Sequence, residues 1–244
     1  MSGKNRLVII ALVLVVTVLI SGCGTVVSNS AEAPRVIQAY GEAELTAAPD
    51  LARISLVIET RSSSAVEAVE ENAQLANAVR ESLLAYGLTE ADLKTGSYNL
   101  YSYREWYEGL PFGEEAPMIY NATNEIVVTT KQLETVGEII DLGVRAGANN
   151  VYYINFELED PQDLMMEALG LAAGQARQKA DAIAGGTGDN IDRLQTIREE
   201  RTDFMPYRYS DMAAQEGLGM GSPTPISPGD VTIRAAVVAE FLIK

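Results

Sequence analysis

The sequence contains no histidine and a single cysteine, Cys23. Without imidazole it cannot support Ser-His-Asp or Cys-His catalysis, and with one thiol it lacks the usual His and Cys ligand sets for zinc or copper. A lone cysteine also excludes disulfides within the chain, so packing has to stabilise the fold. We therefore expect a non-enzymatic protein with no metal and no cofactor.

Basic residues are scarce as well. The 244 residues include 18 lysines and arginines against 34 aspartates and glutamates, which gives a formal net charge of −16. Such a surface repels nucleic acid and anionic lipid headgroups, so we expect no nucleic-acid partner. Hydrophobic residues make up 47% of the chain, so a packed core is expected rather than disorder.

The N-terminal apolar run is too short to span a membrane. It covers 14 residues from Leu7 to Ile20, whereas a spanning helix needs about 20. Lys4 and Arg6 precede it and small residues follow, which is the pattern of a secretory signal segment. Loss of residues 1–22 would remove these two positive charges and no acidic residue, leaving a net charge of −18.

Cys23 follows the apolar run in the string Ile20-Ser21-Gly22-Cys23. This string resembles the lipobox of prokaryotic lipoproteins, in which the thiol receives a diacylglyceryl group and becomes the new N-terminus. Two or more acyl chains on one residue give a stable membrane anchor, at about 0.8 kcal/mol per buried CH₂. The alternative is an uncleaved anchor helix that continues to Val27, with Cys23 incidental.

The pattern along the chain predicts an α+β fold, with helices packed on one face of a mainly antiparallel sheet. We expect a signal peptide over 1–22, a flexible tether over 23–34 and one domain over 35–244, with an irregular excursion at 203–230. Alternating or β-branched runs predict strands at 36–47, 51–60, from 95, and at 118–130, 149–160, 191–200 and 231–244.

Helical periodicity predicts helices over 65–86, 132–146 and 162–184. Serines before 65 and Gly87 supply the caps of the first helix, and the pair Gly185-Gly186 is expected to end the last one. A short helical turn is expected at 89–93. The turn residues Ala48-Pro49-Asp50 predict that the first two strands form a hairpin, with Ile54 on its buried face.

Aromatic residues gather between positions 98 and 120. Tyrosine and tryptophan dominate interface hot spots, so a binding surface and cross-strand packing are the two interpretations. We expect packing for Tyr98 and Tyr120. The candidate interface residues lie in the strand and loop beyond, at Tyr101, Tyr103, Trp106, Tyr107 and Phe112.

Other polar motifs are weaker indications of function. The carboxylates Glu42 and Glu44 share a strand face and are suited in principle to acid–base or cation chemistry, but a solvated face is the favoured interpretation. Asn121-Ala122-Thr123 fits an N-glycosylation sequon, although it falls in a predicted strand. The methionines of the excursion offer reversible oxidation, with gap filling the simpler interpretation; they are Met205, Met212 and Met220.

The chain resembles the SIMPL-domain family, formerly the domain of unknown function 541. The matching stretches occur in the family's order over residues 36–244, and they are Gly41-Glu42-Ala43-Glu44, Pro49-Asp50, ARISLVIET, YNATNEIVVTT, LETVGEIIDLGVRAGANNV, Ala176-Arg177, Lys179-Ala180, Ile183-Ala184 and ISPGDVTIRAAVVAEF. The resemblance implies an α+β domain, export, a tendency to oligomerise and an association with oxidative-stress tolerance. It implies no catalytic residues.

Taken together, these features predict a lipid-anchored protein that faces the periplasm or the cell exterior. We expect it to self-associate as a homo-oligomer, and to meet the membrane through its lipid. One alternative is a binding module for a small ligand or envelope polymer that uses the aromatic residues 101–112. Another is an enzyme that uses carboxylates alone, with Glu42 and Glu44 as the obvious pair.

Overall fold

The computed structural model describes residues 34–106, 115–209 and 224–244. Cys23, the expected signal peptide and nearly all of the tether lie outside the described residues, as do Tyr107, Phe112, Met212 and Met220. Residues Ile37–Lys244 form one unit. Among the described helices, none combines the length and apolar character that a membrane crossing requires.

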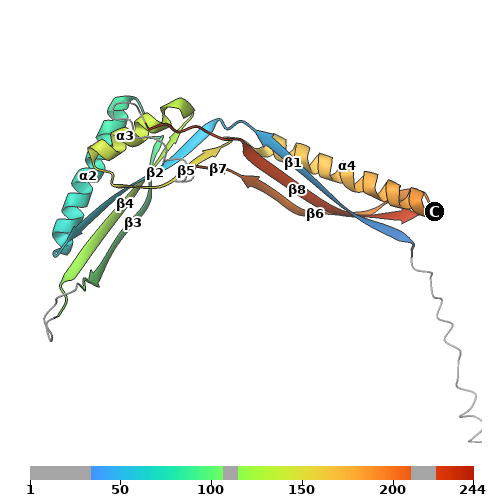
Figure 1. Ribbon diagram of the computed structural model, residues 1–244, viewed down its shortest axis with the longest axis horizontal. Coiled ribbons are helices and arrows are strands. Elements are labelled where there is room, and N and C mark those ends of the chain that lie inside the picture. The colour runs from blue at the N-terminus through green and yellow to red at the C-terminus, as the bar shows by residue number, and fades with distance from the viewer. Residues whose placement is uncertain (1–33, 107–114, 210–223) are drawn as a thin grey trace, which may run out of the picture. The chain divides into compact units, whose positions relative to one another are not determined.

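A five-stranded sheet has the order β3-β4-β2-β5-β7. Every pairing in it is antiparallel. Figure 1 shows helices α2 and α3 with this sheet. The bounds are β2 Leu51–Ser62, α2 Ala65–Tyr86, β3 Leu93–Arg104, β4 Met118–Thr130, the 3₁₀ turn η1 Leu133–Thr135, α3 Val136–Ala146, β5 Asn150–Glu157 and β7 Tyr207–Arg208.

The core of this sheet lies between its central strand and the helices. β2 sends Ile54, Leu56 and Ile58 to the helix face, where all three are fully buried. The opposite face, which we call the outer face, carries the alternating residues of the same strand. Ser55 and Val57 on that face are also fully buried, because β2 has a neighbouring strand on each side. β2 is therefore a central strand rather than a half-buried one.

A three-stranded sheet has the order β1-β8-β6, with helix α4 packed on it (Figure 1). Its elements are β1 Val36–Ala47, α4 Gln162–Thr187, β6 Ile191–Met205 and β8 Val231–Ile243. The helix meets the sheet with one alanine in every fourth position, a spacing that keeps the small side chains on one face. These alanines are all buried: Ala168, Ala172, Ala176, Ala180 and Ala184.

The small residues of α4 let β1 approach its backbone closely. A Cβ placed on Gly41 would lie 2.0 Å from the carbonyl oxygen of Ala172 and 2.7 Å from the backbone nitrogen of Ala176. The side chain of Gln175 accepts a hydrogen bond of 2.9 Å from the backbone N–H of Glu42. Glycine is therefore required at position 41 by the space available there, since its φ is not positive.

The α+β class and the antiparallel strands are confirmed, but the expected hairpin is wrong. β1 pairs in the three-stranded sheet, whereas β2 enters the five-stranded sheet between β4 and β5. Asp50 lies between the two strands and makes two hydrogen bonds there. Its backbone N–H donates a hydrogen bond to the Glu157 carbonyl, and its side-chain carboxylate accepts one from the backbone N–H of Glu159. The turn residues therefore carry the chain from one sheet into the other instead of folding it back.

Other boundaries differ for local reasons. α4 continues through Gly185 and Gly186 and ends only at Gly188, which has φ of 79° and caps the last carbonyls. Residues 89–92 form a turn without helix, held by the N–H of Asp92 donating to Thr89. β6 extends to Met205, into the stretch expected to be irregular, because residues 203–205 pair with β8.

Candidate functional site

The candidate aromatic residues lie on and beyond edge strand β3. Tyr101 and Tyr103 point to the outer face of the five-stranded sheet, with ring centroids 6.2 Å apart. Trp106 follows the strand and is 72% exposed. Tyr98, for which we expected packing, is 53% exposed, so that prediction is wrong; Tyr120 is partly buried as expected.

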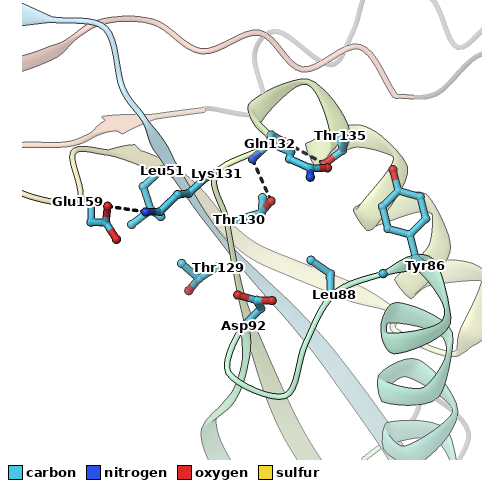
Figure 2. A pocket seen from close by; sticks show the side chains of 11 residues that line it. Leu51, Tyr86, Leu88, Asp92, Thr129, Thr130, Lys131, Gln132, Thr135 and Glu159 are labelled. Carbon is cyan, nitrogen blue, oxygen red and sulfur yellow. Dashed lines mark hydrogen bonds and ion pairs between the residues drawn. The ribbon is translucent and has the colours of Figure 1, made fainter.

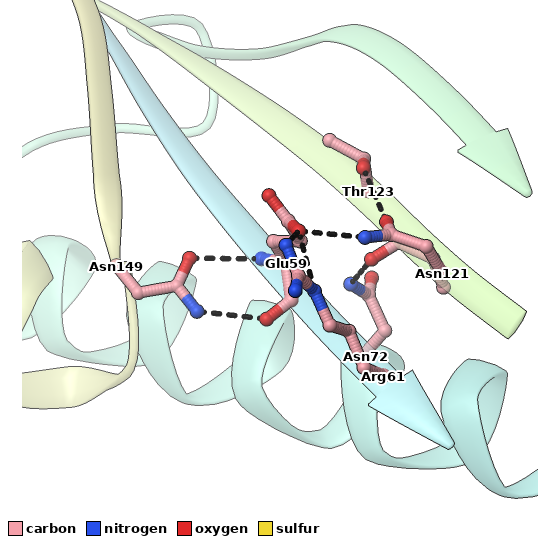
Figure 3. Close-up of polar contacts among 7 residues, drawn as sticks. Glu59, Arg61, Asn72, Asn121, Thr123 and Asn149 are labelled. Carbon is pink, nitrogen blue, oxygen red and sulfur yellow. Dashed lines mark hydrogen bonds and ion pairs between the residues drawn. The ribbon is translucent and has the colours of Figure 1, made fainter. Parts of the chain in front are cut away.

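A polar cluster, drawn in Figure 3, lies on the neighbouring strands, and Tyr101 of β3 stands opposite its member Asn121 of β4. Glu59 and Arg61 of β2 stand opposite Thr123 and Asn121 of β4. The Glu59 carboxylate oxygen Oε1 accepts hydrogen bonds from Arg61 Nε at 3.0 Å and Nη2 at 2.7 Å, and from Asn121 Nδ2 at 2.6 Å. These bonds from Arg61, and then from Asn121, hold the pKa of Glu59 below its ordinary value.

Two further asparagines fix the strands that carry the cluster. The Asn149 side chain accepts from the Glu59 backbone N–H at 3.0 Å and donates to its carbonyl at 2.7 Å. From α2, the buried Asn72 donates to the carbonyls of Ile58 and Ala122, each at 2.9 Å. The cluster is thus held at the backbone by Asn149 and from α2 by Asn72, and its exposed group is the Arg61 guanidinium.

The sequon of the cluster is not accessible in the folded protein. Asn121 is fully buried, and its Nδ2 already donates to Glu59. The Thr123 hydroxyl donates a hydrogen bond of 3.1 Å to the Asn121 side-chain oxygen Oδ1. Glycosylation needs an exposed asparagine amide, so the folded domain does not offer this one.

The paired carboxylates on β1 are part of a mixed-charge surface. Glu44 forms an ion pair of 2.6 Å with Arg234 of β8. Both glutamates line a hollow of the three-stranded sheet that also includes Arg201. Within the described ranges, no group of three or more acidic side chains is placed to hold a metal ion. The arrangement therefore resembles a solvated face more than an acid–base pair.

A pocket at one end of the five-stranded sheet was not predicted from the sequence. We call it the sheet-end pocket; it encloses about 500 Å³ (Figure 2). Its lining residues come from six separate segments. They are the start of β2, the end of α2, the residue before β3, the end of β4, the turn η1 and a residue beyond β5. Its lining residues are Leu51, Tyr86, Gly87, Leu88, Asp92, Thr129, Thr130, Lys131, Gln132, Thr135 and Glu159.

The polar groups of the sheet-end pocket are held by their neighbours. Asp92 accepts hydrogen bonds from the Thr89 hydroxyl at 2.7 Å and backbone N–H at 2.8 Å, and these bonds lower its pKa. Lys131 pairs with Glu159 at 2.6 Å, which raises the pKa of the lysine. Tyr86 donates to Glu138, and this bond with burial raises the pKa of the phenol.

Shifted pKa values therefore concentrate at this end of the sheet. In the part of the chain that the structure describes, six groups have a shifted pKa, and three of them, Tyr86, Asp92 and Lys131, line the sheet-end pocket. Each of these three shifts arises first from a hydrogen bond to a neighbouring side chain rather than from burial, so the shifts reflect local pairing at the pocket. Because the lining residues come from separate segments, no local spacing in the sequence signals them.

Comparison with known proteins identifies relatives over most of the chain. The model of the family SIMPL, described as a protein of unknown function (DUF541), matches residues 37–241. The 26 kDa periplasmic immunogenic protein of Brucella melitensis is 27% identical over 218 residues, covering 86% of each chain. The uncharacterized protein YggE of Edwardsiella ictaluri is 24% identical over 183 residues, covering 75% of each.

A further relative and one solved structure are more distant. Protein YggE of Escherichia coli K12 is 21% identical over 192 residues, covering 77% of this chain and 74% of that one. The crystal structure of an uncharacterized conserved protein from Listeria innocua aligns with 81% of this chain and 92% of its own, at 10% identity and a TM-score of 0.20. That score is too low to support an argument about fold or function.

Proposed function

Since the chain belongs to the SIMPL family, we propose that it is an exported, lipid-anchored envelope protein that self-associates through the open edge of β3. Export is supported by the Brucella melitensis relative, which is named as periplasmic, and by the signal-like N-terminus. Anchoring is supported by Cys23 in its lipobox-like string. A non-enzymatic role is supported by the absence of histidine and of any second thiol from the sequence.

The main support for self-association is that β3 is an edge strand, uncharged between its ends, with exposed apolar side chains. β3 is the outermost strand of its sheet in the described residues. From Thr95 to Tyr103 it has no charged residue, and its Tyr98 and Leu100 side chains are 53% and 42% exposed on the helix face. An uncharged edge strand with exposed apolar side chains is a template for pairing with another chain.

The edges of the three-stranded sheet are protected by comparison. β6 has three register shifts along its pairing with β8, and it carries exposed arginines at 193, 198 and 201. Bulges and charges of this kind hinder edge-to-edge pairing. On β1, the backbone N–H of Glu42 already donates a hydrogen bond to the Gln175 side chain, so it is not free to pair with another strand. β3 has one bulge near Gly96, which leaves residues 98–104 in regular register with β4.

The simplest pairing is a symmetric antiparallel one centred on Asn99. It would place Tyr98 of one protomer opposite Leu100 of its partner, on the helix face of both sheets. The two five-stranded sheets would then be continuous across the interface. Lys94 and Arg104 at the ends of the strand would limit how far the pairing extends, because this register brings like charges together.

Sedimentation velocity tests self-association. Residues 31–244 of the wild type are expected to associate as concentration rises, and Leu100→Lys is expected to remain monomeric because it places a charge in the apolar row. Leu171→Lys is the matched control, since Leu171 is 50% exposed on α4, away from β3. A wild type that stays strictly monomeric at high concentration contradicts the proposal, as does equal association of all three proteins.

The lipid anchor is tested separately with the full chain. The wild type is expected in the membrane fraction with an intact mass that shows loss of residues 1–22 and gain of acyl chains. Cys23→Ser is expected to lack the acyl mass and to leave the membrane fraction. A Cys23→Ser protein that fractionates with membranes as the wild type does would instead support the uncleaved anchor helix.

A second candidate function is a binding module for a small ligand or an envelope polymer. The observation that favours it is the exposure of two aromatic side chains in this part of the sequence, Trp106 at 72% and Tyr101 at 47%. Binding of glycan and peptide probes to the wild type and to Trp106→Ala discriminates the two. Loss of a bound probe in Trp106→Ala, with sedimentation unchanged, would favour the binding module.

A role in oxidative-stress tolerance is the remaining part of the proposal. It is supported by the family resemblance alone, and a lipidated Cys23 leaves no thiol to carry it. Peroxide survival of a deletion strain, complemented with the wild type or with Leu100→Lys, tests whether such a role exists and whether it needs association. Equal survival of the deletion strain and the wild type would contradict this role.

A further inference from the structure

The sheet-end pocket is lined by leucines as well as by groups that can accept hydrogen bonds. Leu51 and Leu88 supply the apolar surface, and Figure 2 shows Asp92 directed toward the space between Thr129 and Leu88. Thr129, Thr130 and Thr135 also line the pocket. The Thr130 hydroxyl accepts a hydrogen bond from the Gln132 backbone N–H at 3.1 Å, and the Thr135 hydroxyl donates one to the Gln132 carbonyl at 2.8 Å, which leaves lone pairs on both oxygens. This combination suits a ligand with a short aliphatic part and a strong donor group.

Asp92 has unused acceptor capacity. Both of its hydrogen bonds from Thr89 end on Oδ2, so among the described residues Oδ1 accepts none. No described basic residue forms an ion pair with it. An aspartate is ionised at neutral pH, and the hydrogen bonds from Thr89 lower the pKa of Asp92 further. The pocket therefore contains a negative charge whose oxygen Oδ1 can accept hydrogen bonds from a ligand.

The other charges of the pocket do not neutralise Asp92. Lys131 forms an ion pair with Glu159, so the charges of these two side chains cancel. The C-terminal end of α2 borders the pocket at Tyr86 and Gly87, and its last turn carries no basic residue. A helix C-terminus bears a partial negative charge and favours cations nearby. The start of α3 borders the pocket as well, at Thr135, and a helix N-terminus bears the opposite partial charge. Among the residues that line the pocket, Asp92 is therefore the one formal charge outside an ion pair.

We propose that the sheet-end pocket binds a small aliphatic amine as its ammonium cation. The three N–H donors of an ammonium group match Asp92 Oδ1 and the threonine hydroxyls, while its carbon chain lies on Leu51 and Leu88. A metal ion is a poorer fit, because the described residues place no cluster of three acidic ligands here. Asp92 directly precedes β3, but no residue of β3 itself lines the site, which therefore does not depend on self-association.

Isothermal titration of the full chain, extracted in detergent, tests this with pentane-1,5-diamine as the probe. We expect saturable binding at one site per chain. Pentane-1,5-diol, which has no charge, and glutarate, which has the opposite charge, are expected not to bind. Nα-acetyl-lysine amide distinguishes the source: weaker binding than the diamine indicates a free amine, and tighter binding indicates a lysine side chain of a peptide.

Variants separate site binding from general attraction to an acidic protein. Asp92→Asn is expected to weaken diamine binding at least about tenfold, the effect of losing a charge-assisted hydrogen bond. Glu167→Gln, which removes an exposed acid on α4, is the matched control and is expected to bind as the wild type does. Thr129→Lys supplies a tethered ammonium beside Asp92 and is expected to block the probe, which keeps the test decisive if Asp92→Asn does not fold.

Several results would overturn the proposal. They are wild-type affinity in both Asp92→Asn and Thr129→Lys, equal weakening in Glu167→Gln, and binding of glutarate in preference to the diamine. Leu100→Lys is expected to bind the diamine normally, so failure of the self-association proposal leaves this result unchanged. Binding that never saturates and vanishes in moderate salt would show surface attraction only, and would also contradict the site.

Discussion

At the residue scale, the packing of the three-stranded sheet depends on the absence of a side chain at Gly41. The carbonyl oxygen of Ala172 occupies the space where a Cβ would stand, at 2.0 Å. Both β1 and α4 use small residues at this contact, so their backbones approach more closely than larger side chains would permit. The obstacle is backbone rather than the end of a flexible side chain, and it can yield only by moving a whole element.

Gly41→Ala should therefore destabilise the domain. We expect a loss of about 1–3 kcal/mol in the free energy of unfolding, the usual cost of overpacking. Gly174→Ala is the matched control, because no atom lies within 4 Å of its added Cβ, and it should gain about 0.5–1 kcal/mol by helix propensity. Urea denaturation measures both. A neutral Gly41→Ala would show that α4 shifts freely on the sheet.

Glu59 is the residue whose ionisation is most directly tied to its neighbours. Its pKa is lowered first by the hydrogen bonds from Arg61 and next by the bond from Asn121. A carboxylate with a lowered folded-state pKa stabilises the native protein above its unfolded value of about 4.3. This stabilisation is lost as the pH falls through the folded-state pKa.

Asn121→Ala is expected to raise the pKa of Glu59 toward its ordinary value, as measured by an NMR titration of the side-chain carboxyl. The stability difference between wild type and variant should be largest near pH 7 and should shrink as the pH falls below about 4. An unchanged Glu59 pKa in the variant would mean that Arg61 alone sets it. A stability difference independent of pH would mean that only packing is lost.

At the scale of elements, α2 is joined to the sheet by a polar contact as well as by its apolar face. Asn72 is fully buried and bridges the backbones of β2 and β4 through one amide nitrogen, while its Oδ1 has no partner among the described residues. The amide thus fixes where α2 lies along two strands. An apolar side chain at this position would leave that placement to less directional contacts.

Asn72→Ala is predicted to cost about 1–3 kcal/mol of stability, because it removes two buried hydrogen bonds and leaves two carbonyls without that donor. Asn77→Ala is the control, since Asn77 is exposed on the same helix, and its effect should be within about 0.5 kcal/mol. Thermal and chemical denaturation of the two variants provides the comparison. Equal effects would show that the buried amide contributes nothing beyond helix propensity.

The elements themselves could largely be predicted from the sequence, because their signals are local. Ser64 and Gly87 bound α2 as expected, with Ser64 accepting from the Glu67 N–H and Gly87 in the left-handed region at φ of 117°. The division into two sheets could not be predicted. Alternation shows which face of a strand is buried, but it does not show which strand is its neighbour, so β1 and β2 have the pattern of a hairpin without forming one.

The candidate site could be predicted from the sequence only in part, unlike the helices and strands. Tyr101 and Tyr103 were identified because they are close in sequence, and the structure brings them together. The sheet-end pocket brings Asp92 near Thr129 and Lys131 only after β3 and β4 have paired. Such a site depends on long-range register, which no local motif encodes.

At the scale of the whole molecule, the proposed self-association uses the β3 edge and the proposed ligand uses the sheet-end pocket. The chain carries 34 acidic residues against 18 basic ones, so like charges oppose close approach of two copies. An uncharged strand from Thr95 to Tyr103 is a surface along which this repulsion is weakest. Association should accordingly strengthen as salt screens the remaining charges.

Disulfide trapping at the centre of the proposed interface tests self-association through β3. Residues 31–244 contain no cysteine, so a single Asn99→Cys substitution reports one contact. Under mild oxidation we expect a covalent dimer of Asn99→Cys, because opposed residues of paired strands lie within reach of a disulfide. Asn77→Cys, exposed on α2, should remain monomeric. Equal and low cross-linking of both variants would contradict association through β3.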